Sequence, residues 1–137
     1  MKIDTISENE ETVDVVKDAI GKTIKKLWLE DDTTLIFHFT DGSGLELYDS
    51  MQECCEERYM RTDDDLEEFI GAVLLDFELK DVFEEDDDGM AENYENVYHE
   101  IQFLDVKTDK GVFQMANHNR SNGYYDGFYI VAEKITV

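Results

Sequence analysis

The sequence predicts a single α+β domain over residues 1–137, in which an antiparallel β-sheet of about six or seven strands is accompanied by two short helices. Three observations predict this class. The chain has 137 residues, which suits one domain, and 42% of them are hydrophobic, which is enough for a core. Apolar residues alternate with polar ones in several short runs that are separated by turn residues. Only two segments have capping and apolar spacing that are typical of helices.

The first expected helix occupies the segment before Gly21. Ser7 and Glu10 form a capping-box pattern, in which the two side chains satisfy backbone donors at the start of a helix. Val13 and Val16 then lie on one helical face, and Gly21 supplies a left-handed stop. This pattern predicts a helix ending near residue 20.

The second expected helix begins near Thr62, where another capping-box pattern places acidic residues at the positive end of a helix. Leu66 and Phe69 are three residues apart and would share a face. Gly71 follows as a stop. Strands are expected on both sides of this helix, over 23–29, 33–40, around Leu45 and Leu47, 73–79, 98–108, 112–117 and 125–133.

The two halves of the chain share an order of features that suggests a weak internal repeat. Each half has a capped helix that ends in Ile-Gly, then a strand, an acidic turn, a strand, a glycine turn and another strand. The second half differs mainly by a long acidic loop over residues 84–96.

The charge of the chain excludes several classes of function. The sequence has 35 Asp and Glu residues against 12 Lys and Arg residues, giving a formal charge of −23. Bulk nucleic acid and anionic membranes would be repelled by such a surface. No apolar run approaches the ~18 residues of a membrane span, and no signal-peptide pattern opens the chain, so we expect a cytoplasmic protein. The charge fits a basic partner or the imitation of nucleic acid.

The acidic loop contains a near-match to a calcium-binding loop. Glycine in the middle of such a loop provides a sharp bend, and carboxylates surround the hard cation. The first position is Glu where Asp is usual, Ala91 replaces a larger apolar residue, and no second loop of this kind is found. We therefore favour a solvated run of charges and expect no metal. The positions that match are Glu84, Asp86, Asp88, Gly89 and Glu95.

The two cysteines, Cys54 and Cys55, are adjacent, and neighbouring residues rarely meet disulfide geometry. We expect reduced thiols. The alternative is half of a soft-metal site with His99 or His118, although the usual CxxC spacing is missing.

Motifs of enzymes are absent from the sequence. It contains no Gly-x-Ser-x-Gly elbow, no phosphate-binding Gly-Lys-Ser/Thr loop, no His-Glu-x-x-His and no Gly-x-Gly-x-x-Gly. With 35 acidic residues, pairs of carboxylates occur by chance and do not indicate acid–base catalysis. We expect no catalytic residue and no cofactor.

Two unusual clusters indicate ligand binding. The chain has only three arginines, Arg58, Arg61 and Arg120, and these are its only side chains able to bind phosphate bidentately. An anionic ligand of this acidic chain needs a local positive pocket. The alternative is that these arginines pair with nearby carboxylates. The segment 116–128 combines amides, a histidine and tyrosines, which suits either a long turn or a flat polar ligand.

These clusters resemble a family of small phage proteins, the Thoeris anti-defence sponges. The resemblance covers roughly residues 20–133 and is carried by Cys54-Cys55-Glu56, Arg58-Tyr59-Met60, Asp63-Asp64-Asp65-Leu66, Phe69-Ile70-Gly71, Asn117-His118-Asn119 and Asn122-Gly123-Tyr124-Tyr125.

The resemblance implies a non-enzymatic role. Members of the family sequester isomers of cyclic ADP-ribose made by infected bacteria, some also capture cyclic oligonucleotides, and the ligand is held between protomers of a homo-oligomer. On the matched motifs, Arg58 and Arg61 would bind phosphates, and Phe103 or Tyr124 would stack on a ring. The polar edges of the ligand would be bound by Asn117, His118, Asn119 and Asn122.

A competing hypothesis assigns the chain to a different class. An acidic phage-type decoy would imitate DNA and block a basic host protein, as the charge of −23 favours. A positive pocket within a negative field would support the sponge, whereas a uniformly negative surface would support the decoy.

Overall fold

The structure, a computed structural model, describes residues 10–50, 56–85, 98–121 and 128–136. These residues form nine strands, one α-helix and one turn of 3-10 helix. The helical elements are α1 (Glu10–Ala19) and η2 (Leu66–Phe69), and the strands are β1 (Ile24–Glu30), β2 (Thr34–Phe39), β3 (Ser43–Asp49), β4 (Glu56–Arg61), β5 (Leu74–Leu79), β6 (Phe83–Glu85), β7 (Tyr98–Thr108), β8 (Gly111–Ser121) and β9 (Ile130–Thr136).

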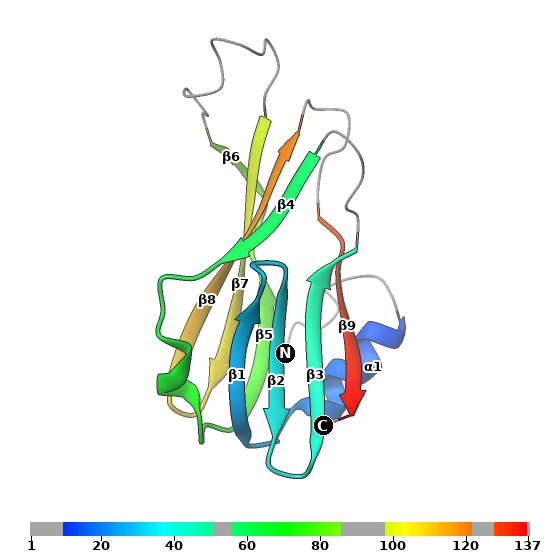
Figure 1. Ribbon diagram of the computed structural model, residues 1–137, viewed down its shortest axis with the longest axis vertical. Coiled ribbons are helices and arrows are strands. Elements are labelled where there is room, and N and C mark those ends of the chain that lie inside the picture. Colours follow the sequence, from blue (N-terminus) through cyan, green and yellow to red (C-terminus); the bar gives the residue numbers. More distant parts are fainter. Residues whose placement is uncertain (1–9, 51–55, 86–97, 122–127, 137) are drawn as a thin grey trace.

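The strands form two antiparallel sheets (Figure 1). The first sheet has four strands in the order β1-β2-β3-β9. The second has five, in the order β4-β8-β7-β5, with β6 also paired to β7. The prediction of antiparallel strands with few helices is confirmed. The expectation of one sheet with about six or seven strands was wrong. The described chain has more strands, divided between two sheets.

The second expected helix is only a single 3-10 turn. Asp65 caps it by accepting a hydrogen bond from the Glu67 backbone, so the helical turn begins three residues after Thr62, the cap that the pattern predicts. The backbone becomes extended at Ile70, however, because the chain must bring Gly71 to the first sheet. There the Gly71 N–H donates to the Ile24 carbonyl at 2.7 Å. This long-range bond ends the helix after four residues.

The regions without clear alternation account for the other differences. β4 and β6 were not predicted, since charged residues dominate both sequences. β8 continues to Ser121, past the predicted end at residue 117, because it is paired on both sides there. Asn119, for example, lies opposite Arg58 on β4 and Glu100 on β7. Residues that are typical of turns are thus held in a strand by their neighbours.

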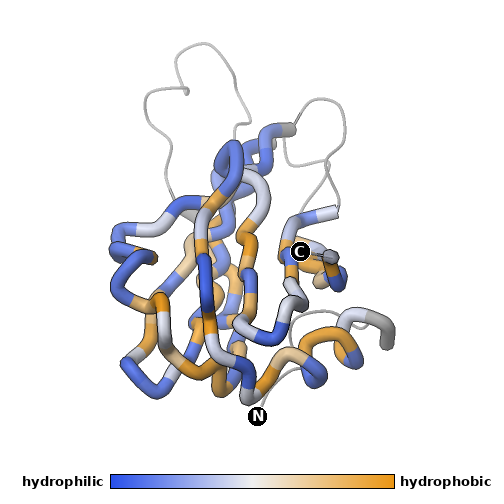
Figure 2. The backbone as a smooth tube through the Cα atoms, turned by 60° about the horizontal axis from the view of Figure 1, so that its bottom comes forward, coloured by the Kyte–Doolittle hydropathy of each residue, from blue (hydrophilic) through white to orange (hydrophobic). Residues whose placement is uncertain are grey.

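The hydrophobic core lies between the two sheets. The ring of Phe37 contacts Phe77 edge-on at a centroid distance of 5.9 Å and approaches Phe113 at 6.5 Å, so one side chain joins both sheets. Figure 2 shows hydrophobic segments along the strands and α1, with hydrophilic segments at the turns. Alternation along the expected strands predicts that Phe37, Phe77, Phe103 and Ile130 face inward. This is confirmed for Phe37, Phe77 and Ile130. Phe103 is only half-buried, and its inward position was wrong.

The internal repeat is confirmed in the pairing of the strands. The order β1-β2-β3 in one sheet matches β5-β7-β8 in the other. The strand that follows each unit, β4 or β9, joins the sheet of the opposite unit. The joint between the units is equally symmetric, since Gly21 donates to the Leu74 carbonyl at 2.8 Å and Gly71 donates to that of Ile24 at 2.7 Å. The fold is therefore two similar units that exchange their last strands.

Among the described residues, no helix has the length and apolar character required to cross a membrane.

Candidate functional site

The candidate site is on the outer face of the second sheet, along the β7–β8 hairpin. Each strand of this hairpin has 11 residues, whereas β2 has 6 and β3 has 7. In Figure 1 the ends of β4, β7 and β8 extend past β1 and β2. Alternation along β8 directs Asn117 and Asn119 to the inner face, and Ala116 and His118 to the outer face.

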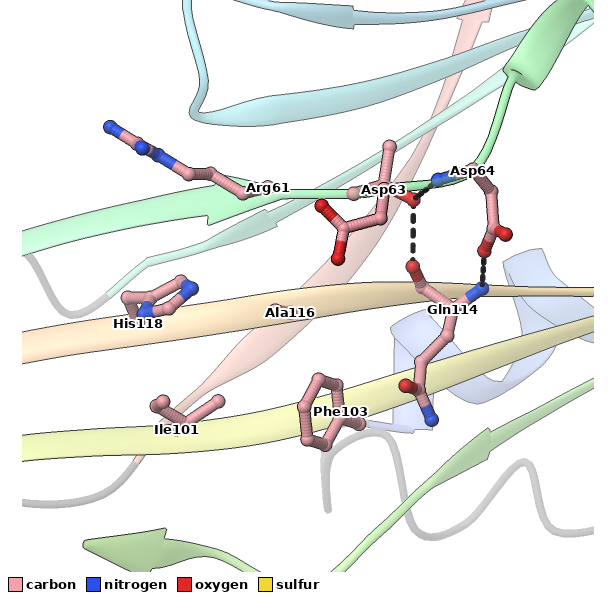
Figure 3. A pocket seen from close by; sticks show the side chains of 9 residues that line it. Arg61, Asp63, Asp64, Ile101, Phe103, Gln114, Ala116 and His118 are labelled. Carbon is pink, nitrogen blue, oxygen red and sulfur yellow. Dashed lines mark hydrogen bonds between the residues drawn. The ribbon is translucent and has the colours of Figure 1, made fainter. Parts of the chain in front are cut away.

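A pocket of about 390 Å³ lies on this outer face (Figure 3). Its apolar part comes from neighbouring positions of β7 and β8. Its polar part comes from the end of β4 and the segment after it. The residues that line the pocket are Arg61, Thr62, Asp63, Asp64, Ile101, Phe103, Gln114, Ala116 and His118.

Two hydrogen bonds join the segment after β4 to β8, and a third lies within the segment. The Thr62 hydroxyl donates to the Gln114 carbonyl at 2.8 Å and accepts from the Asp64 backbone N–H at 3.1 Å. The Gln114 N–H donates to the Asp64 carboxylate at 2.8 Å. These contacts satisfy backbone groups at the edge of β8 and give the pocket a wall of defined position (Figure 3).

A stack of four side chains borders the pocket. The Arg61 guanidinium lies over the Tyr59 ring, 5.2 Å from its centroid. Tyr59 is nearly parallel to His118, with centroids 4.5 Å apart and an interplanar angle of 5°. The ring of His118 also contacts His99, whose Nε2 lies 2.8 Å from His118 Nδ1. The stack holds the arginine beside the pocket and orients the histidine.

His118 is uncharged at neutral pH. Burial lowers its pKa from 6.5 to about 4, and electrostatic interactions with His99, Arg61 and Arg120 lower it further. Its ring therefore offers a neutral polar edge, and the role of each nitrogen depends on the tautomer. The permanent positive charge at the pocket wall comes from Arg61.

Arg58 lies on the opposite face of β4. Its Nη1 is 2.6 Å from Asp49 Oδ2, and the two side chains are only 3% and 8% exposed. The ring of Phe128 lies below the guanidinium at 6.0 Å. This ion pair joins β4 of the second sheet to β3 of the first. Arg58 and Arg61, to which the matched motifs assign phosphate binding, therefore lie on opposite faces of β4.

The predicted amides are also on the inner face. Asn117 is 1% exposed and its amide donates to the Gln102 carbonyl at 3.1 Å. Asn119 is fully buried. Asn117 lines a small cavity of about 50 Å³ together with Arg58 and Asp49. Asn117 thus links β8 to β7, while the ion pair of Arg58 with Asp49 links β4 to β3.

The structure thus brings together three of the predicted ligand-binding residues, Arg61, Phe103 and His118, in one pocket. It separates Arg58, Asn117 and Asn119 from them. The remaining predicted residues, Asn122 and Tyr124, lie outside the described residues. So do Cys54, Cys55 and most of the calcium-like loop.

Sequence reasoning missed the residues that complete the site, above all Tyr59, His99 and Asp63. Tyr59 and Arg61 are two residues apart and lie on the same face of β4. In a strand this spacing predicts that the two side chains are neighbours. The contact of Tyr59 with His118 could not be predicted from the sequence, because it depends on the register of β4 against β8. Within the part of the chain that the structure describes, no group of three or more His, Cys, Asp or Glu side chains is placed to hold a metal ion.

The chain belongs to the DUF7448 family, a domain of unknown function, whose profile matches residues 17–130. This match includes both sheets up to the first residue of β9 and all the residues that line the pocket. No curated protein matched the chain. No solved structure matched it either.

Proposed function

We propose that this DUF7448 protein binds and sequesters a cyclic nucleotide signal, such as an isomer of cyclic ADP-ribose, without converting it. The observation that carries the proposal is the convergence of Arg61, Phe103 and His118 on one pocket. In a chain of charge −23, a fixed arginine beside an aromatic ring suits a ligand that is both anionic and flat.

The dimensions and chemistry of the pocket support this class of ligand. Its volume of about 390 Å³ is within the roughly 300–1,000 Å³ that is typical of small-molecule sites. Arg61 would bind the pyrophosphate, and its position over Tyr59 reduces the freedom that it would lose on binding. Phe103 and Ile101 would contact the base or a ribose.

A binding role without chemistry is supported by the state of the reactive groups. The Thr62 hydroxyl is engaged with the Gln114 carbonyl, and the Asp64 carboxylate accepts from the Gln114 backbone. His118 is hydrogen-bonded to His99, and its pKa is lowered to about 4. It is therefore too weak a base to activate a nucleophile efficiently at neutral pH.

The proposal includes a homo-oligomer in the cytoplasm of an infected host cell. A pocket on one sheet face leaves part of a dinucleotide-sized ligand uncovered, and a second protomer would enclose it. Phe83 is 43% exposed and its ring lies 5.6 Å from that of Phe103, so apolar surface continues beyond the pocket. Light scattering at physiological salt should give at least a dimer. A strict monomer would contradict this part of the proposal.

Calorimetry with isomers of cyclic ADP-ribose tests the proposal. Arg61→Ala should weaken binding by roughly 10- to 200-fold, the equivalent of losing a hydrogen bond to a charged group. Lys25→Ala removes an exposed cation from the first sheet and is the matched control. Heat denaturation of the complex should release intact ligand. Absence of binding by the parent, or release of a converted product, would overturn the proposal.

The acidic decoy remains a second candidate, favoured by a carboxylate cluster on the outer face of the first sheet. Burial, then a side-chain hydrogen bond with Glu133 and the negative charges of Glu133 and Glu30, raise the pKa of Glu46. A decoy would use such carboxylates in place of phosphates. Competition with duplex DNA for a basic protein, lost on combined Glu→Gln substitution of these three residues, would support it.

A further inference from the structure

One wall of the pocket has no role in the capture of an anion. Asp63 lines the pocket opposite its apolar residues, close to Arg61 in the chain, and its side chain is exposed. A carboxylate at this place opposes the entry of phosphate. We infer that Asp63 recognises the free ribose hydroxyls of the ligand, so that the pocket selects a nucleotide with an open diol; this inference rests on the proposed function.

The position of Asp63 is imposed by its two neighbours. Thr62 and Asp64 are both hydrogen-bonded to the backbone of Gln114, at 2.8 Å in each case. Asp63 is held between these two anchors, and Figure 3 shows its carboxylate turned toward β8. The backbone at Asp63 is therefore held in the wall of the pocket by its two neighbours.

The chemistry of this wall selects hydrogen-bond donors. An ionised carboxylate accepts hydrogen bonds and donates none. Its two oxygens match the two adjacent hydroxyls of a ribose, and acidic side chains have this role in dinucleotide-binding folds. The neighbouring Asp64 is already engaged with the Gln114 N–H, so Asp63 is the carboxylate that is placed for this contact.

The charges of the pocket also fix the direction of the ligand. Arg61 and the neutral edge of His118 form one end, and Asp63 forms the other polar wall. A phosphate would be placed at Arg61 and would be repelled from Asp63. A ligand that carries phosphate at one end and hydroxyls at the other satisfies both. Inorganic pyrophosphate satisfies only the first.

The test compares two probes on matched variants. Wild type, Asp63→Asn, Arg61→Ala and the control Asp81→Asn, which changes an exposed carboxylate elsewhere, are titrated with cyclic ADP-ribose and with inorganic pyrophosphate. Asp63→Asn should weaken cyclic ADP-ribose about 10-fold, as expected for loss of one charge-assisted hydrogen bond. It should leave pyrophosphate unchanged or tighter. Arg61→Ala should weaken both probes.

The outcomes distinguish failure of the Asp63 assignment from failure of the proposed function. If Asp63→Asn leaves cyclic ADP-ribose binding unchanged or tightens it, the assignment of Asp63 is wrong while the proposed function stands. If the effect of Asp63→Asn disappears with the cyclic inosine analogue, Asp63 contacts the adenine amine and the diol assignment is overturned. If wild type binds neither probe, the proposed function fails and this inference fails with it.

Discussion

The two sheets are built alike at their joint and differ at their far ends. Both begin with a glycine of positive φ, Gly21 at 91° and Gly71 at 90°, followed by a strand that bonds to its counterpart in the other unit. The β2–β3 hairpin ends after 6 and 7 residues, whereas both strands of the β7–β8 hairpin have 11. The candidate site lies across the start of the extra length, since Ile101 and His118 are on it and Ala116 comes just before it.

The inward-facing residues of β8 change from apolar to polar toward the end of the strand that extends beyond the first sheet. Phe113 and Met115 are fully buried in the shared core. Two positions later the inward residues become Asn117 and Asn119, which are also buried but polar. The part of the molecule where the two sheets pack on each other is thus stabilised by apolar burial. The far ends of β4, β7 and β8 are held by hydrogen bonds and an ion pair. Core and pocket thus use opposite faces of the same strand, since Gln114 and Ala116 line the pocket.

The largest expected effect is at the base, where Phe37 joins the sheets. Phe37→Ala should lower the free energy of unfolding by about 3–5 kcal/mol, because a fully buried ring in contact with Phe77 and Phe113 is replaced by a cavity. Urea denaturation followed by fluorescence and circular dichroism should show one shared transition. Two separate transitions would show instead that the two sheets fold independently.

The next effect is at the ion pair that anchors the extension. Arg58→Ala should cost about 3 kcal/mol of stability, because it leaves Asp49 buried without its 2.6 Å partner. Removing both charges with Arg58→Met and Asp49→Leu should cost less. The measurement is the urea midpoint with and without ligand. Unchanged stability together with weaker binding would instead return Arg58 to the ligand site.

A smaller pair of effects tests the symmetry of the joint. Gly21→Ala and Gly71→Ala should each cost about 1–2 kcal/mol, because an L-residue is strained at this positive φ. The Gly71 change should cost slightly more, since its new Cβ would lie 3.3 Å from Lys110 Nζ, while Gly21 has open space. Thermal unfolding of the two variants checks this. A large effect at one glycine alone would show that the units are not equivalent.

The smallest effect concerns pH. His118 stays neutral in the folded protein down to about pH 4, whereas in the unfolded chain it takes up a proton near pH 6.5. Stability should therefore fall as the pH is lowered from 7 to 4, by about 1 kcal/mol after allowance for the half-exposed position of the ring. His118→Gln should remove this part of the loss. An NMR titration with a His118 pKa near 6.5 would contradict the prediction.

The sequence by itself determined the elements with clear local patterns. Alternation placed Phe37 and Phe77 inward, the capping pattern indicated a helical element in the segment of η2, and glycines marked the joints of the repeat. The charge of −23 limited the kinds of partner. These features follow from side-chain periodicity and turn chemistry, which act over a few residues.

Only the tertiary structure decided which faces and partners the polar residues have. Apolar residues occupy both phases of β7, so the local pattern could not show that Phe103 faces outward; the pairing of Leu104 with Met115 decides it. The same register separates Arg58 from Arg61 and stacks Tyr59 on His118. The exchange of β4 and β9 between the units is likewise set by contacts between distant segments. A one-residue change of register would reverse every face, and only packing of the whole core fixes it.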